Sequence, residues 1–105
     1  YNALRMMAKF ARQLGKPHRE YDAMAERVLA RFSRFWNEDA NYCYDVIDSP
    51  TGQDAALRPN QIFTVSLPES PLSVNQQKAV VDACSRSLLT SYGLRSLDPH
   101  HSDYR

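Results

Sequence analysis

The chain has 105 residues, the size of one small domain, of which 43% are hydrophobic and 24% charged, as is typical of globular proteins. A net charge of +1 gives no electrostatic reason to expect a nucleic-acid partner or an anionic membrane surface. No apolar run approaches the roughly 20 residues that a membrane-spanning helix needs.

The two ends of the chain and its cysteines give two further expectations. The sequence opens inside a helical pattern at Tyr1 and stops at Arg105 without a terminating signal. We therefore expect residues 1–105 to be one partial domain of a longer protein, cut at both ends. Cys43 and Cys84 are too few for a disulfide framework, so we expect free thiols and a cytoplasmic location.

Two helices are predicted at the start of the chain. In residues 2–14 apolar side chains recur at helical spacing, and Gly15 stands where a left-handed C-terminal cap belongs. Pro17 suits the first turn of a second helix, which we predict to run to Trp36. The short break between the two helices predicts an antiparallel hairpin.

An irregular region follows this hairpin. The polar loop 37–41 lacks the spacing of a calcium-binding loop, so we expect no metal there. Residues 42–47 alternate enough to predict a short strand, and residues 48–52 have the composition of a turn.

Two further helices are predicted after Pro59. Residues 60–66 can form about two turns of helix, and Ser73 and Gln76 have the spacing of a capping box. The last helix is therefore predicted to run from Val74 to Leu89. The whole chain is predicted to be mainly α, with helix hairpins and one long irregular loop region. The buried stripe expected on the last helix consists of Val74, Val81, Cys84 and Leu88, with Val80 beside it.

The stretch from Asp54 to Gln61 collects a carboxylate, a guanidinium and two amides around Pro59. Proline fixes its own backbone and favours an extended residue before it, so these polar groups lie on a stiff segment. If Asp54 pairs with Arg58, its ionised form is stabilised and can accept hydrogen bonds from hydroxyl groups. Two interpretations follow: the stretch binds hydroxyl-rich ligands, or the pair only holds the loop in place.

Other titratable residues give weaker signals. His100 and His101 are adjacent in a polar tail, where neighbouring side chains of an extended segment point to opposite sides, so we expect a solvated tail and no metal site. We expect no other cofactor. Carboxylates that are candidates for acid–base chemistry by residue type, although each is expected to serve a turn or a cap, are Asp45, Asp48, Asp54 and Glu69.

Three segments, taken in order, resemble a known family. They are Tyr1-Asn2-Ala3-Leu4, the Asp54 to Gln61 stretch, and Tyr92-Gly93-Leu94-Arg95-Ser96-Leu97. Together they are similar to the C-terminal glucosidase domain of glycogen debranching enzymes, with the nearest likeness to the bacterial and archaeal type. The resemblance spans essentially all 105 residues.

The resemblance implies that the chain is a fragment of an (α/α)6 toroid, in which helix hairpins surround an axial pocket. It implies hydrolysis of the α-1,6-linked glucose at branch points of glycogen or limit dextrin, with inversion, by a general acid and a general base. We expect the acid upstream of Tyr1 and the base downstream of Arg105, so the chain alone is expected to be inactive. The residues that the resemblance implies for binding the branched α-glucan are Asp54, Arg58, Asn60 and Arg95.

Two other functions remain open. The parent protein could be a related toroid hydrolase acting on another α-glucoside. The chain could instead be a non-catalytic helical interaction module, in which case changing Asp54 or Arg58 to Ala would not impair function. Because a partial toroid leaves helix faces unpaired, we also expect the isolated chain to self-associate.

Overall fold

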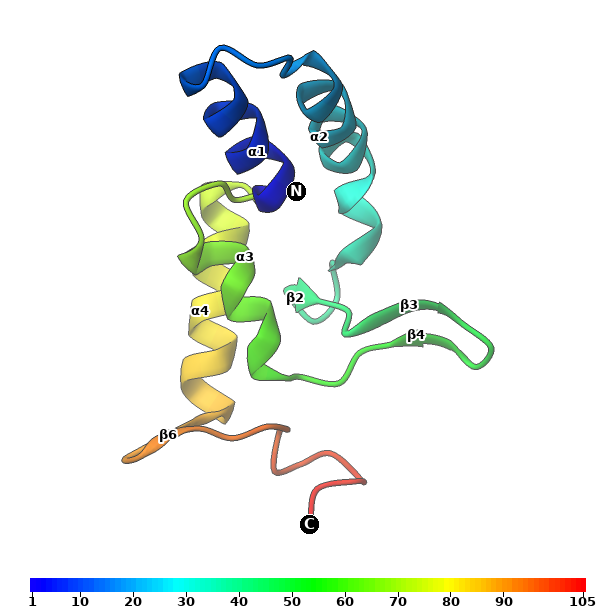
Figure 1. The fold of residues 1–105 in the computed structure, drawn as a ribbon. Helices are drawn as coiled ribbons and strands as arrows, with labels where there is room; N and C mark the ends of the chain where they lie inside the picture. Colours follow the sequence, from blue (N-terminus) through cyan, green and yellow to red (C-terminus); the bar gives the residue numbers. More distant parts are fainter.

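Helices dominate the fold (Figure 1). The structure is a computed structural model that describes residues 1–105, and about half of them are helical, so the chain is mainly α. None of the helices combines the length and apolar character that crossing a bilayer requires. The helical elements are α1 (Asn2–Gln13), α2 (Arg19–Arg31), the 3₁₀ helices η1 (Phe32–Phe35) and η2 (Pro59–Ile62), α3 (Phe63–Ser66) and α4 (Val74–Ser87).

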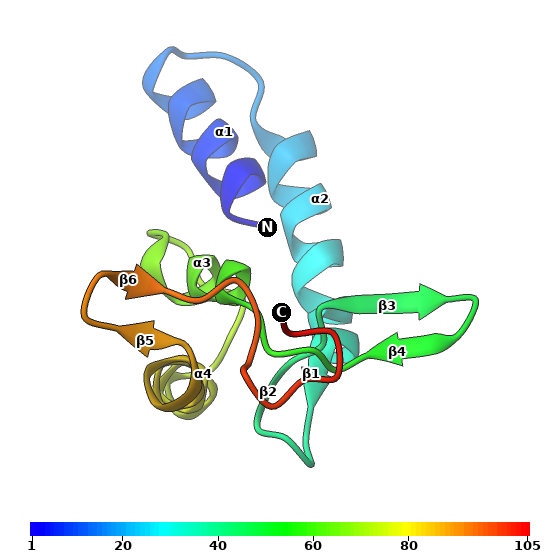
Figure 2. The same ribbon diagram turned by 90° about the horizontal axis from the view of Figure 1, so that it is seen from below.

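Helices α1 and α2 form the predicted antiparallel hairpin, which stands apart from α4 in both views (Figures 1 and 2). Gly15 has a φ of 63°, a left-handed conformation that glycine adopts without steric cost, and it follows directly after the C-cap of α1. Asn2 connects this hairpin to the rest of the chain, because its side-chain oxygen accepts the backbone N–H of Glu69 at 3.0 Å.

Partly exposed ion pairs link the two helices. Arg5 pairs with Glu26 at 3.3 Å. The carboxylate of Asp22 pairs with the guanidinium of Arg12 and with the ring of His18. The His18 hydrogen bond, followed by Arg12, holds the pKa of Asp22 below its usual value. The stability that ionised Asp22 adds to the hairpin is therefore fully present above the ordinary pKa of an aspartate. It is lost as the pH falls through the lowered pKa of Asp22.

The prediction that the second helix runs to Trp36 is wrong. Helix α2 ends at Arg31, η1 follows it, and Trp36 begins strand β1. In a 3₁₀ helix, residues three apart lie on the same side, which brings the rings of Phe32 and Phe35 into a stack with centroids 5.4 Å apart. This stacking gives a physical reason for the tighter turn at the end of the helix.

The strands form three separate antiparallel ribbons: β1 (Trp36–Asn37) with β2 (Tyr42–Cys43), β3 (Val46–Ser49) with β4 (Gly52–Asp54), and β5 (Leu89–Thr90) with β6 (Gly93–Leu94). The predicted strand over residues 42–47 is therefore divided between two ribbons. The β3–β4 ribbon projects from the side of the molecule (Figures 1 and 2).

The predicted capping box of α4 is confirmed, because Ser73 and Gln76 exchange both side-chain-to-backbone hydrogen bonds. The predicted buried face is only partly correct, since Val74 is 80% and Val81 43% exposed. At about 100° per residue, both lie roughly 100–120° around the helix from Val80, at the edge of the face that packs inward. The buried residues of the α4 segment are Val80, Ala83, Cys84 and Leu88.

The hydrophobic core lies between α4 and the irregular region. It joins Trp36 and Cys43 of the β1–β2 ribbon to Leu57, Leu72 and the buried face of α4. The radius of gyration is 16.0 Å, whereas a compact chain of this size has about 13 Å. Only 15 of the 105 residues are buried, and the chain is therefore open in shape.

Leu88 and Leu89 provide a direct test of this core. Leu88 is fully buried, whereas its neighbour Leu89 is 56% exposed. We expect Leu88→Ala to lower the free energy of unfolding by about 2–5 kcal/mol, because it removes packed atoms and leaves a cavity. Leu89→Ala is expected to change it by less than about 0.5 kcal/mol. Urea denaturation of both variants measures the difference, and equal losses would contradict the assignment of the core.

The exposed faces of α1 and α2 generate a second prediction. Met7, Phe10 and Leu14 of the α1 segment are 44%, 48% and 73% exposed. Apolar patches of this kind favour association, so we expect the isolated chain to self-associate as its concentration rises. Sedimentation velocity over a concentration series measures this, with Phe10→Glu expected to weaken it and Lys9→Glu, on the same helix, as the control. A monodisperse monomer at high concentration would contradict the prediction.

Candidate functional site

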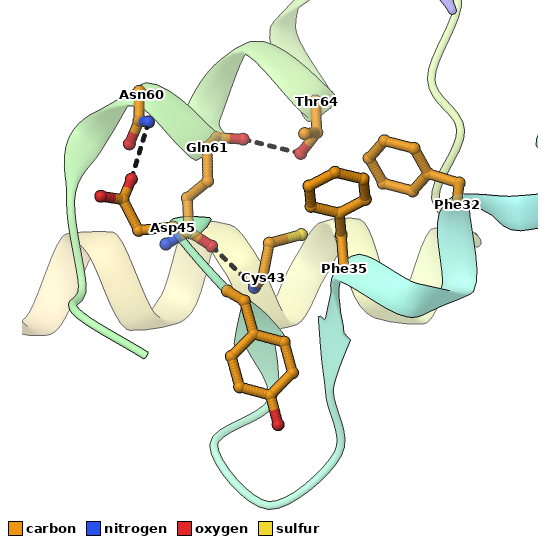
Figure 3. A pocket seen from close by; sticks show the side chains of 8 residues that line it. Phe32, Phe35, Cys43, Asp45, Asn60, Gln61 and Thr64 are labelled. Atoms are coloured by element: carbon orange, nitrogen blue, oxygen red, sulfur yellow. Dashed lines mark hydrogen bonds between the residues drawn. The ribbon is translucent and has the colours of Figure 1, made fainter. Parts of the chain in front are cut away.

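A cavity of about 150 Å³ lies where η1, β2 and η2 meet (Figure 3). This is smaller than the roughly 300–1,000 Å³ of pockets that enclose a small-molecule ligand, so the cavity is too small to enclose such a ligand. One side is aromatic and the other polar, as Figure 3 shows. The lining residues are Phe32, Phe35, Cys43, Tyr44, Asp45, Asn60, Gln61 and Thr64.

Gln61 joins the two segments that form the cavity. Its Oε1 accepts the backbone N–H of Cys43 at 3.1 Å, although the two residues are 18 positions apart. Its backbone carbonyl accepts the hydroxyl of Thr64 at 2.6 Å, one turn further along the chain. Gln61 is 8% exposed, so losing the Cys43 hydrogen bond would leave a buried polar group unsatisfied.

Asp45 lies at the polar side of the cavity, and two side chains from beyond the β3–β4 ribbon converge on it. Its Oδ1 accepts the side-chain amide of Asn60 at 3.0 Å, and its Oδ2 pairs with Nε of Arg58 at 3.1 Å. The Asp45 backbone N–H donates to the carbonyl of Asp54 at 2.8 Å. The side chain of Asp45 is 14% exposed and that of Arg58 39%, so the pair reaches solvent through the guanidinium.

The expected pair between Asp54 and Arg58 does not form, because Arg58 pairs with Asp45. A four-residue separation brings side chains together on a helix, but it spans up to about 13 Å in an extended segment. Arg58 is extended, with φ −125° and ψ 155°. Asp54 instead caps its own turn, with Oδ1 accepting the backbone N–H of Ala56 at 2.8 Å.

Of the four residues predicted to bind a glucan, only Asn60 lines the cavity, and Arg58 contacts the cavity through Asp45. Arg95 is placed at the end of α4. Its backbone N–H donates to the carbonyl of Leu88 at 2.8 Å, and its Nη1 reaches the carbonyl of Ser87 at 3.4 Å. In this chain Arg95 therefore braces the turn after α4.

The sequence also contained a signal for the position of Asp45. The turn residues 48–52 lie between two extended segments, and a hairpin there pairs residues at equal distances on either side of the turn. This places Val46 opposite Asp54, as the register of the ribbon shows, and so brings Asp45 beside Asp54 and within reach of the residues around Pro59. The aromatic wall carried no comparable signal, since Phe32 and Phe35 were assigned to a continuous helix and its core.

The C-terminal segment is hydrogen-bonded to the stretch from Asp54 to Gln61. The backbone N–H of Asp98 donates to the carbonyl of Leu57 at 3.1 Å, and Leu97 beside it is buried. The backbone N–H of His100, the larger influence, and its ring lower the pKa of Asp98. No three potential metal ligands lie close enough together in the chain to hold an ion.

Chemically, this arrangement suits binding. The guanidinium of Arg58 and the amide of Asn60 are anchored at one end by the same carboxylate. A stacked pair of aromatic rings stands on the other side of the cavity. Small-molecule sites commonly combine apolar walls with a few fixed polar groups, which give the ligand its orientation.

Comparison with known proteins identifies the family. The family model described as amylo-alpha-1,6-glucosidase matches residues 1–105. The chain belongs to the amylo-alpha-1,6-glucosidase family. The resemblance stated from the three ordered segments is thereby confirmed at the level of the family. No curated protein and no solved structure matches the chain.

Cys43 gives a prediction about the cavity wall. Both cysteines are free, as predicted, and both are buried. Burial, with a smaller contribution from Cys84, raises the pKa of the Cys43 thiol to about 11. At pH 8 only about one thiol in 1,000 is then ionised, so we expect slow alkylation by iodoacetamide that speeds up as the pH rises toward 11.

Mass spectrometry of alkylated peptides from the native chain measures this rate. The control is Ser85→Cys, because Ser85 is exposed on α4 next to buried Cys84. We expect the introduced thiol to react much faster than Cys43 at pH 8, and both to react at similar rates after denaturation. Equal rates in the native chain would show that the cavity wall is open at Cys43.

Proposed function

We propose that this chain is part of a glycogen debranching enzyme that hydrolyses the α-1,6-glucosidic branch points of glycogen or limit dextrin with inversion. The observation that carries this proposal is the match of the amylo-alpha-1,6-glucosidase family over residues 1–105. The polar groups beside the aromatic wall of the cavity add chemical support, since both suit a ligand with an apolar ring and many hydroxyl groups.

The proposed architecture of the parent domain is an (α/α)6 toroid. Two features of the chain support it. The α1–α2 hairpin is antiparallel and leaves apolar residues of both helices exposed, as expected of an element that packs against further helices. The radius of gyration of 16.0 Å exceeds that of a compact chain of this length by about 3 Å, which fits a partial domain.

In this proposal the chain holds the glucan and does not transfer protons. Arg58 and Asn60 are the proposed contacts to sugar hydroxyls, while Asp54 and Arg95 stay predictions that the geometry of the cavity does not specifically support. Inversion requires a general acid and a general base about 6.5–9.5 Å apart, with a water molecule between them. We propose that both come from parts of the parent protein outside these residues, so the chain alone is inactive.

The test uses the intact parent protein and a phosphorylase limit dextrin. We expect release of free glucose, with the β-anomer formed first in an NMR time course, because inversion changes the α configuration. Release of maltose or longer sugars without glucose would contradict the reaction. Hydrolysis of another α-glucoside with limit dextrin left intact would favour the related toroid hydrolase.

Arg58 and Arg34 provide a matched pair of variants for the same assay. Each forms an ion pair with an aspartate, Arg58 with Asp45 and Arg34 with Asp48 at 2.7 Å. We expect Arg58→Gln to lower kcat/KM by about 10–100-fold, because hydrogen bonds between a charged group and the ligand are lost. Arg34→Gln, which breaks an exposed ion pair between η1 and the β3–β4 ribbon, is expected to stay within about twofold. Unchanged kcat/KM in folded Arg58→Gln would favour the non-catalytic interaction module.

A further inference from the structure

We propose that Asp45 is a positioning residue that orients Arg58 and Asn60 to bind two neighbouring hydroxyl groups of one sugar ring. The identity of that sugar as a glucose unit rests on the proposed function. The orientation itself rests on the contacts around Asp45.

The carboxylate of Asp45 is divided between its two partners. Oδ1 accepts the amide of Asn60 at 3.0 Å, and Oδ2 pairs with Nε of Arg58 at 3.1 Å. Because each oxygen holds a different side chain, one group fixes the positions of both. Asp45 is itself fixed, since its backbone N–H donates to Asp54 and its side chain is only 14% exposed.

The groups of Arg58 and Asn60 that remain free have chemistry that complements sugar hydroxyl groups. Neither Nη1 nor Nη2 of Arg58 has an acceptor within the chain, and Oδ1 of Asn60 has no donor. A guanidinium donates only, whereas an amide oxygen accepts. A sugar hydroxyl does both, so two adjacent hydroxyls can accept from Arg58 and donate to Asn60. Pro59, between the two residues, restricts the backbone and keeps their separation constant.

A purely structural role does not require this pattern. The β3–β4 ribbon is already held by backbone pairing and by the hydroxyl of Ser49, which donates to the carbonyl of Gly52. A partly exposed ion pair adds little to folding stability. Arg58 pairs with Asp45 through Nε, and its two terminal nitrogens make no hydrogen bond within the chain. An arginine that served only to hold Asp45 could instead donate from two nitrogens to the carboxylate.

The experiment measures binding of glucose and of its four monodeoxy analogues at positions 2, 3, 4 and 6 to the intact parent protein, by ligand-observed NMR titration. We expect the unchanged protein to bind the analogues lacking the contacted hydroxyls about tenfold more weakly than glucose. Asp45→Asn is expected to bind glucose weakly and to lose this discrimination, because it keeps the shape but releases Arg58.

Asp48→Asn is the matched control, since it removes the charge of an exposed aspartate of β3 that pairs with Arg34 of η1. It is expected to keep the full discrimination. If Asp45→Asn fails to fold, Asn60→Ala replaces it, because the Asn60 side chain is exposed and its removal is expected to be tolerated. That variant is expected to lose discrimination at one of the two hydroxyls.

Retained discrimination in Asp45→Asn, or in Asn60→Ala where the former does not fold, would overturn the proposal. Equal loss in Asp48→Asn would overturn it as well. Binding is measured without turnover, so the outcome is separate from the proposed reaction. If the intact protein releases no glucose but shows the expected selectivity among the analogues, only the proposed reaction is contradicted. If it releases glucose but does not discriminate among the analogues, only the proposed role of Asp45 is contradicted.

Discussion

The buried side chain of Gln61 is the contact on which the candidate site depends. Its Oε1 holds the backbone of Cys43, and this hydrogen bond fixes η2 over the β1–β2 ribbon. Asp45 follows Cys43 by two residues, and Asn60 immediately precedes Gln61. Once the two segments are joined at Gln61, Asp45 and Asn60 must lie close together. The polar cluster thus depends on the buried side-chain amide of Gln61. Gln61 positions the residues of the site without itself having to contact a ligand.

The sequence was most informative where structure is local. The left-handed conformation of Gly15, the capping box of α4 and the α1–α2 hairpin depend on residues within a few positions of each other, and each was predicted correctly. The end of α2 was not, because apolar spacing at Phe32 and Phe35 fits a continuing helix as well as a 3₁₀ turn. What decides between the two is ring stacking, which helical periodicity does not reveal.

The candidate site was predicted only as a region. The stretch around Pro59 was identified correctly as part of a family pattern, and Asn60 lines the cavity. The partner of Arg58 was not predicted, because proximity in sequence favoured Asp54 over Asp45. The ribbon between them reverses the chain, so a residue 13 positions away is nearer to Arg58 than one four positions away. A contact such as that between Asp45 and Arg58 depends on the position of the turn and on the register of the ribbon. Both must be known before the contact can be predicted.

The balance between rigid and open parts of the chain agrees with a role in binding. The polar cluster and the cavity wall are held by the buried side chain of Gln61 and by Asp45, whose side chain is 14% exposed, whereas α1 and α2 keep apolar residues exposed. A cavity of about 150 Å³ can contact one side of a sugar ring but cannot enclose it. In the proposed toroid the remaining contacts come from other hairpins, which would also cover the exposed faces of α1 and α2. The same packing that stabilises this chain would then complete its site, so folding of the parent domain and formation of the glucan pocket are coupled in this proposal.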